Sequence, residues 1–310
     1  MRAVLSVLLA LLLLVPCAAL GEDAPAKEPA LLSMPLPIDF SGGMEPLEEF
    51  YKDDYTYEDP TISVHINFRD DLSDYMTGYK GNKKSGAWIV DIRLGHASQL
   101  RTLAAVSFNK KDSKAVEQMA GWVNAVVAFN GDFAARRTEG LIIRQGETFK
   151  NKLKGALDVL AIDEDGDFHL IAKPRKGDVG DSIDGKKILN AFYFGPILVN
   201  NGEVPDKFAA KPNYLHEDEF YARLAICQVG PLHYKMIITT MQDVTVGMKL
   251  MDFARLCRDE GAIYAYNLDG GYSAAMIFRG QMVNDEKNAE PRNVPDIVYF
   301  ASAWNGEDIE

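Results

Sequence analysis

The stretch LMDFARLCRDEGAIYAYNLDGGYSAAMIF, residues 250–278, contains a helix, a strand, a turn and a second strand in one run. Four of its apolar residues share one helical face at three- and four-residue spacing: Leu250, Phe253, Ala254 and Cys257. Gly261 is a natural C-terminal stop for that helix. The apolar run 262–268 then predicts a strand, and residues 274–278 predict another. This region therefore indicates a fold that combines helices with strands.

Strands predominate in the rest of the chain. Residues 61–68 alternate strictly between apolar and polar, which is the signature of a half-buried strand. Residues 114–123 are expected to form a helix. Further strands are expected at 87–94, 125–129, 140–144, 158–162, 168–172, 191–199, 223–229, 234–240 and 296–300. Many strands with two evident helices indicate an α+β fold, a single domain over residues 55–305 with a largely antiparallel or mixed sheet core and a few helices.

The N-terminal residues 1–21 have the pattern of an export signal. Met1 and Arg2 give a short positive start, a leucine-rich run follows, and small residues precede a polar stretch. We predict a cleaved signal peptide, with an N-terminal membrane anchor over residues 4–20 as the alternative. Residues 22–54 contain five prolines and scattered acids, which favours a proline-rich tether. Both alternatives predict a secreted or extracytoplasmic protein.

Composition excludes several classes of partner. The 310 residues carry 33 Lys+Arg and 45 Asp+Glu, a formal net charge of −12. This argues against a nucleic-acid partner, because binding the phosphate backbone needs clustered cations. The acidic balance also limits any expected membrane contact to the N-terminal segment, if it is uncleaved. Cys227 and Cys257 would remain after export; they could pair, but isolated buried cysteines are favoured.

An acidic run at residues 163–167 raises the question of calcium binding. An EF-hand loop needs glycine at its sixth position and glutamate at its twelfth. Here Gly166 is the fourth residue of the run, and no such glutamate follows. Because apolar strands flank the run, a hairpin turn is the simpler interpretation. No metal and no cofactor are expected from the sequence.

Two segments with the same local pattern follow two of the predicted strands. Asn130 and Asp132 lie two residues apart beside Gly131, and Asn267 and Asp269 lie two residues apart before a glycine pair. On an extended chain this spacing points the two side chains to the same side. Carboxylates, amides and exposed N–H groups suit acid–base chemistry on a polar substrate with a phosphate nearby. The same residue types are also common in plain turns, so the pattern alone leaves both interpretations open.

The second segment resembles the signature of the phosphodiester glycosidase family. The matching residues are Asn267-Leu268-Asp269-Gly270-Gly271 followed by Ser273. Further matches occur in the family's order: Asn130-Gly131-Asp132-Phe133, Gly140 to Gly146, Gly195 to Val199, Arg223 to Ile226, Gly247 to Gly261, and Arg292 before Asp296-Ile297-Val298. The resemblance covers roughly residues 55–300 and implies an exported glycoside hydrolase that cleaves sugar-1-phosphodiester bonds. Examples are α-N-acetylglucosaminyl phosphodiesters in envelope polymers or glycans.

The resemblance also implies roles for individual residues. Asp269 is the first candidate for the catalytic nucleophile or base, and Asp132 for its catalytic partner. Arg223 and Arg292 are the candidates for binding the phosphate, because a guanidinium group binds phosphate in a bidentate manner. The remaining substrate-binding candidates are the N–H groups of Gly270 and Gly271, together with Asn130, Asn267 and Ser273.

The chain departs from the family pattern after the glycine pair. Tyr272, Ala274 and Ala275 stand where the family usually has a third glycine and hydroxyl-bearing residues, and Cys227 stands where a glycine is usual. Lost polar contacts at an occupied site would alter substrate preference. The alternative is therefore a non-catalytic glycan- or polymer-binding envelope protein that keeps the fold with a degraded site.

Overall fold

The structure is a computed structural model that describes residues 28–29, 35–240, 245–284 and 292–306. The predicted signal peptide, residues 1–21, lies outside the described residues. Within them, the strands form three sheets, and every strand pair in these sheets is antiparallel. The prediction of a largely antiparallel sheet core is confirmed.

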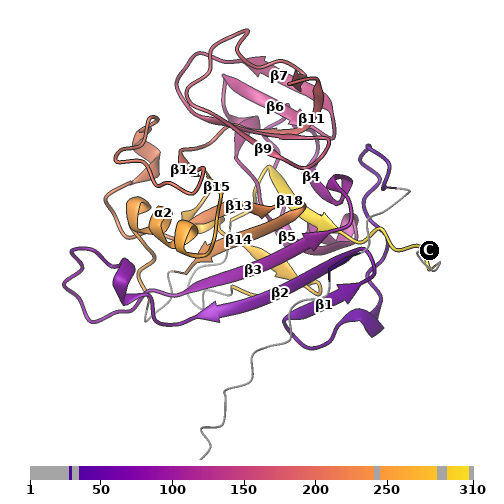
Figure 1. Ribbon diagram of the computed structural model, residues 1–310, viewed down its shortest axis with the longest axis horizontal. Helices are drawn as coiled ribbons and strands as arrows, with labels where there is room; N and C mark the ends of the chain where they lie inside the picture. The colour runs from indigo at the N-terminus through magenta and orange to yellow at the C-terminus, as the bar shows by residue number, and fades with distance from the viewer. Residues whose placement is uncertain (1–27, 30–34, 241–244, 285–291, 307–310) are drawn as a thin grey trace, which may run out of the picture.

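The seven-stranded sheet contains the first strands of the domain and the strand that precedes the second Asn-x-Asp segment. Its order is β1 (Thr56–Asp59), β2 (Ile62–Arg69), β3 (Ala87–Leu94), β14 (His233–Thr239), β13 (Leu224–Gly230), β15 (Tyr264–Leu268) and β12 (Ile197–Asn200). The helix α2 (Leu250–Asp259) packs against β12 and β15 (Figure 1). Its apolar face is the one expected from the sequence, because Leu250, Phe253, Ala254 and Cys257 are all buried.

The other two sheets come mainly from the middle and the end of the chain. The six-stranded sheet has the order β7 (Glu147–Lys152), β6 (Gly140–Arg144), β11 (Lys186–Phe192), β8 (Val159–Asp163) and β9 (Phe168–Ile171), with β10 (Ser182–Ile183) also on β11. The five-stranded sheet has the order β17 (Gln281–Met282), β16 (Met276–Phe278), β5 (Ala125–Asn130), β18 (Asp296–Ala301) and β4 (Leu100–Ala104). In Figure 1 the six-stranded sheet lies at the top, on the opposite side of the molecule from β1 and β2.

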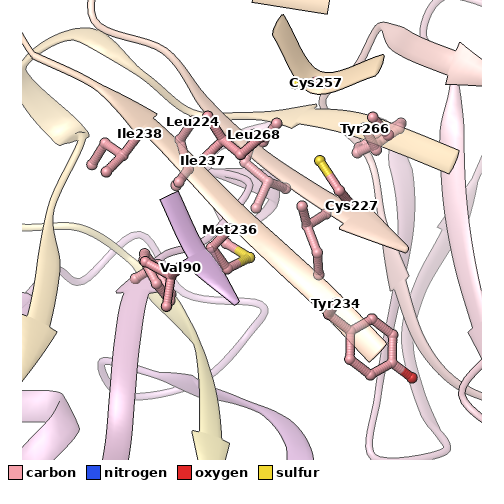
Figure 2. Close-up of a cluster of buried hydrophobic side chains, with 14 of the residues drawn as sticks. Val90, Leu224, Cys227, Tyr234, Met236, Ile237, Ile238, Cys257, Tyr266 and Leu268 are labelled. Atoms are coloured by element: carbon pink, nitrogen blue, oxygen red, sulfur yellow. The ribbon is translucent and has the colours of Figure 1, made fainter. Parts of the chain in front are cut away.

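The main hydrophobic core joins the seven-stranded and five-stranded sheets. In β5, Val127 and Phe129 lie in this core, whereas Ala128 faces a second cluster with the helix α1 (Val116–Trp122). From Val127 to Phe129 the side chains alternate as the two-residue period of a strand requires, and Val126 also lies in the main core. Figure 2 shows side chains from β3, β13, β14 and β15 gathered in the main core. The strands β5 and β15, which precede the two Asn-x-Asp segments, therefore both pack into the main core.

Two features of the fold differ from the expectation. The described residues contain only two α-helices, of seven and ten residues, so the domain is more β-rich than an α+β description implies. The predicted tether also extends less far than residue 54. Leu36 is buried, and the buried guanidinium of Arg101 donates hydrogen bonds to the carbonyl groups of Pro37 and Asp39 at 2.9 and 2.6 Å. These contacts fix residues 36–39 on the domain.

Short 3-10 segments complete the described structure. They are η1 (Glu48–Phe50), η2 (Ser73–Tyr75), η3 (Ala97–Gln99), η4 (Ala134–Arg136), η5 (Asn213–Leu215) and η6 (Gly271–Ser273). Within the described ranges no helix is long and apolar enough to cross a membrane. Cys227 and Cys257 are both buried and free of disulfide bonds in this structure, but their side chains contact each other, so they are not isolated. The acidic run forms the turn of the β8–β9 hairpin, where Asp163 accepts hydrogen bonds from two backbone N–H groups of the same run.

Candidate active site

The two Asn-x-Asp segments meet where β5 of one sheet and β15 of another come to an end. We call residues 130–132 the first motif and residues 267–269 the second motif. The side-chain amide of Asn130 donates to the carbonyl group of Asp269 at 2.7 Å, and the N–H of Asp269 approaches the carbonyl group of Gly131 at 3.4 Å. Asn130 also accepts a hydrogen bond from the N–H of Ala275 at 3.1 Å. Asn130 therefore holds the chain on both sides of the glycine pair.

A cavity of about 340 Å³ opens beside the second motif. We call it the Asp269 cavity. Its lining residues are Phe133, Arg137, Phe194, Tyr214, Leu215, His216, Tyr221, Ala222, Arg223, Asn267, Leu268, Asp269, Gly270, Tyr272 and Arg292. Among these described residues Asp269 is the only carboxylate, and several are aromatic or basic. The cavity therefore combines one negative group with a positively charged, aromatic surround.

Asp269 lies in this cavity with 13% of its side chain exposed. Its carboxylate accepts a hydrogen bond from Arg292 at 3.3 Å, and Arg292 in turn donates through Nε to the Ser273 hydroxyl at 2.6 Å. Burial raises the pKa of Asp269 above the ordinary aspartate value, while Ser273 and Arg292 oppose that rise. The result is a largely buried carboxyl group whose charge is stabilised by the exposed Arg292 and, without a direct ion pair, by Arg137.

Asp132 lies elsewhere, in a buried ion network behind the cavity. Its side chain has no exposed surface, and its carboxylate pairs with the equally buried Arg144 at 2.9 Å. It also accepts the N–H of Tyr193 at 2.7 Å. Arg144, at the end of β6, reaches Asp296 at 3.4 Å as well. The network therefore links the five-stranded and six-stranded sheets, and Asp132 is not among the residues that line the cavity.

Asp296 shows the electrostatic strain of this network. Burial, together with the nearby charge of Asp132, raises the pKa of Asp296 to about 7, and Arg144 only partly opposes this. Two carboxylates near one guanidinium favour a form of the pair that keeps one proton.

Arg223 lines the cavity, but its donors are largely used by the protein. Its Nε, Nη1 and Nη2 groups donate to the carbonyl groups of four residues: Met248, Leu215, His216 and Glu219. A guanidinium has five N–H donors, so most of them are occupied here. Burial lowers the pKa of Arg223 to about 10. Arg223 therefore holds the loop 215–219, which contributes Leu215 and His216 to the cavity wall.

The glycines of both motifs permit close backbone packing. A Cβ atom on Gly270 would lie 2.4 Å from the carbonyl oxygen of Ala222, and one on Gly131 would lie 2.5 Å from a carboxylate oxygen of Asp296. Gly271 has a φ of +57°, and its N–H donates to the Ala222 carbonyl group at 2.9 Å. That N–H is therefore directed at the protein, which differs from the expected role in phosphate binding.

The other substrate-binding candidates divide between the cavity and its support. Asn267 lines the cavity and donates through its amide to the carbonyl group of Gly195 at 2.9 Å, while its buried Oδ1 has no hydrogen-bond partner. Ser273 is buried and supports Arg292. Within the described residues, no group of three or more His, Cys, Asp or Glu could hold a metal ion.

Several cavity residues had no signal in the sequence analysis. Arg137 follows the first motif closely but belongs to no recognisable pattern, and Tyr214 lies in the short 3-10 segment η5. His216 stacks on Tyr221 with ring centroids 5.3 Å apart. Tyr272, which is 64% exposed, was recognised only as a departure from the family pattern. The short sequence distance between the first motif and Arg137 is the one feature of the sequence that indicates a place for Arg137 near the cavity.

Comparisons with known proteins find the same fold. The catalytic domain of zebrafish N-acetylglucosamine-1-phosphodiester alpha-N-acetylglucosaminidase, auto-inhibited by its pro-peptide, is similar to this chain with a TM-score of 0.64 and 17% identity. The similarity covers 84% of this chain and 87% of that one. A protein of Synechocystis gives a TM-score of 0.51 at 14% identity, over 77% of this chain and 62% of that one. At these identities the likeness shows a shared fold.

No curated protein matches this chain. The family model described as phosphodiester glycosidase matches residues 123–301, more than half of the sequence and the part that contains both motifs and the Asp269 cavity. The resemblance noted from the sequence is thereby confirmed, and the chain belongs to the phosphodiester glycosidase family.

Proposed function

We propose that this protein hydrolyses sugar-1-phosphodiesters, with Asp269 as the catalytic carboxylate. The observation that carries the proposal is the contact at 3.3 Å between Asp269 and Arg292 at the wall of the Asp269 cavity. A carboxylate and an exposed guanidinium in contact suit a bond that joins a sugar to a phosphate. The family membership and the activity for which the zebrafish relative is named support the same choice.

The proposed reaction breaks the bond between the anomeric carbon and the phosphate oxygen. The bonding electrons leave with the phosphate, positive charge develops on the sugar, and water supplies the new hydroxyl group. Asp269 either forms a bond to the anomeric carbon as the nucleophile, which water later breaks, or accepts the proton of the attacking water as the base. Arg292 binds the phosphate and neutralises the charge it gains. The products are the free sugar and a phosphate monoester of the remaining group.

A single cavity carboxylate suits this substrate better than an ordinary glycoside. Glycosidases commonly use a second carboxyl group to protonate the leaving oxygen. A phosphate leaving group is already acidic and needs little protonation. The burial of Asp132 behind the cavity therefore agrees with a reaction in which Asp132 supports the site through Arg144 and does not contact the substrate.

Asn267 is the proposed contact to the sugar. Its Oδ1 is buried without a partner in the cavity wall, and a buried acceptor without a donor costs about 1–3 kcal/mol. A sugar hydroxyl or an N-acetyl N–H would satisfy it.

The test is release of free sugar from a panel of sugar-1-phosphodiesters, including α-N-acetylglucosaminyl diesters. We expect turnover to fall as the pH drops through a value above the ordinary aspartate pKa, because burial raises the pKa of Asp269 and the reaction needs its ionised form. Binding of the diesters without any release of sugar would instead establish the non-catalytic alternative.

We also propose that the protein acts outside the cytoplasm. The proposal rests on the sequence of residues 1–21, with its positive start, leucine-rich run and small residues before the polar stretch. N-terminal sequencing of the protein from its native host tests it. A new N-terminus near residue 20 or 22 supports export with cleavage, and recovery of intact Met1 in the cytoplasmic fraction contradicts export.

A further inference from the structure

Arg137 lies in the wall of the Asp269 cavity between two aromatic rings. Its guanidinium carbon is 4.5 Å from the ring centroid of Tyr214 and 5.1 Å from that of Phe194. The Tyr214 hydroxyl donates to the carbonyl group of Phe194 at 3.3 Å, which ties the two aromatic residues together. The planar guanidinium is therefore held against preformed aromatic faces.

Within the described ranges, Arg137 is half-buried and has no ion pair of the kind that the buried arginines Arg144 and Arg101 form. Arg144 pairs with Asp132, and Arg101 and Arg223 donate to several carbonyl groups. The Nε of Arg137 is buried and has no hydrogen-bond partner. In the part of the chain that the structure describes, no carboxylate lies within 4.0 Å of its guanidinium nitrogens. A desolvated donor of this kind is unfavourable until an acceptor reaches it.

Two of the three described arginines that line the cavity, Arg292 and Arg137, thus differ in how their donors are used. Arg292 already contacts Asp269 and Ser273, whereas the Nε of Arg137 is enclosed by the protein and has no acceptor among the described residues. Both line the same cavity of about 340 Å³. An anionic group placed there would meet two guanidinium groups, one of them held in advance by aromatic stacking, so little conformational entropy is lost when it binds.

We infer that Arg137 binds the phosphate group of the substrate and makes the Asp269 cavity selective for phosphodiesters over neutral glycosides. This inference rests on the proposed function. It replaces Arg223, whose donors hold the cavity loop, with Arg137 as the second phosphate ligand beside Arg292. Arginine suits this task because its planar fork matches two phosphate oxygens at once.

The test compares Arg137→Ala and Arg137→Lys with the full-length wild-type protein. The readouts are KM and kcat for a chromogenic sugar-1-phosphodiester and the inhibition constant of inorganic phosphate. For Arg137→Ala we expect KM and the phosphate inhibition constant to rise together by about ten- to a hundred-fold, the value of a charge-assisted hydrogen-bonded pair. Arg137→Lys keeps the charge but loses the flat fork, so its values should fall between those of the wild type and Arg137→Ala.

Arg136→Ala is the matched control. It removes the same charge from the neighbouring residue, which is exposed, donates to the Ser113 hydroxyl at 2.6 Å and does not line the cavity. Both constants should stay within about two-fold of the wild type, as expected for an exposed charge. If KM and the phosphate inhibition constant rose equally in Arg136→Ala and Arg137→Ala, the effect would be a general one of charge, and the assignment to Arg137 would be overturned.

The outcomes separate this inference from the proposed function. If the wild type hydrolyses the diester and Arg137→Ala keeps its KM and its phosphate inhibition, the inference fails and the proposed function stands. If the wild type hydrolyses no diester, the proposed function fails, and calorimetry with inorganic phosphate decides the inference. Binding that is lost in Arg137→Ala then supports Arg137 as an anion ligand, and binding that persists refutes it.

Discussion

The first and second motifs share one sequence pattern and have different surroundings. Each is an Asn and an Asp two residues apart at the end of a buried strand, and the two are joined by the hydrogen bond from Asn130 to the backbone of Asp269. Yet Asp269 lies in a cavity with 13% of its side chain exposed, whereas Asp132 has none and faces Arg144. One motif presents its carboxylate to a cavity, and the other uses it to join two sheets.

This difference shows what a spacing rule conveys. Two-residue spacing on an extended chain states that two side chains point the same way, but it does not state what they face. Asp132 faces the end of β6 and pairs there with Arg144. Asp269 follows the end of β15 and faces the Asp269 cavity. The same residue type is a candidate for chemistry in one place and a structural ion in the other.

The strongest way to break the comparison is Asp269→Asn. If Asp269 is the catalytic carboxylate, kcat/KM for a sugar-1-phosphodiester should fall by about 10²- to 10⁴-fold. Because burial already disfavours the charged form of Asp269, the neutral amide should leave the melting temperature nearly unchanged. Steady-state kinetics and thermal unfolding of the same preparation measure both quantities.

The control for this substitution is Asp74→Asn, which makes the same chemical change at an exposed position. Its kinetics and melting temperature should match the wild type. Asp269→Asn with more than a tenth of wild-type kcat/KM would remove Asp269 from the chemistry and leave the two motifs without a functional distinction.

Asp132→Asn should show the opposite pattern. It breaks the buried contact with Arg144, and we expect the free energy of unfolding to fall by about 3 kcal/mol. This is the lower end for such a loss, because Asp296 remains beside Arg144. Below its melting temperature the folded variant should keep kcat/KM within several-fold of the wild type. Urea denaturation and kinetics at low temperature provide the two measurements.

A more exposed ion pair gives the reference for that prediction. Asp91→Asn removes a carboxylate that is 28% exposed and paired with His233. Its cost should stay below about 1 kcal/mol. If Asp132→Asn abolished turnover while unfolding like the wild type, Asp132 would be catalytic, and the division between the two motifs would be wrong.

A third comparison is between Gly271 of the glycine pair and Gly280. An added Cβ would strain the backbone at both positions, but it would meet a steric clash only at Gly271. A Cβ on Gly271 would lie 2.3 Å from the Tyr221 ring, whereas a Cβ on Gly280 would meet nothing within 4 Å, and both residues have positive φ. Gly271→Ala should therefore lower the free energy of unfolding by about 2 kcal/mol and Gly280→Ala by about 1 kcal/mol. Since Tyr221 lines the cavity, only Gly271→Ala should also raise KM. Equal effects of the two variants on unfolding and on KM would show that the packing of Gly271 on Tyr221 does not shape the cavity.

How far the sequence predicts this molecule depends on the range of the interactions involved. The face of α2 and the strand 262–268 follow from local periodicity, so their prediction agrees with α2 and β15 of the structure. The partners of Arg223 do not follow from any local pattern, because Leu215, His216 and Met248 lie outside the α-helices and strands, and only the fold brings them together. Arg137 was missed for the same reason.

The packing role of the glycines was also out of reach of the sequence. A glycine pair after a strand suggests exposed N–H groups, and that expectation is reasonable without neighbours. The close approach of Ala222 to Gly270 and Gly271 exists only because β13 pairs with β15 and so brings residue 222 to the end of the second motif. Local residues thus indicate where a site lies, and sheet pairing decides which atoms remain open to a ligand.

The smallest expected effect concerns the proton held in the network of the first motif. Burial raises the pKa of Asp296 to about 7 in the folded protein, above the ordinary aspartate value of about 3.9 in the unfolded chain. The folded state therefore binds more protons than the unfolded state between those values, so the free energy of unfolding should fall as the pH rises through this window. Between pH 6 and pH 7 one such group contributes a loss of about 1 kcal/mol. Asp296→Asn should remove that loss. The histidines are common to both proteins, so the difference between their urea-denaturation curves at the two pH values isolates the carboxyl group. An identical pH slope in the wild type and the variant would mean that the carboxylates around Arg144 hold no extra proton, and that the first motif is a fully ionised, balanced ion network.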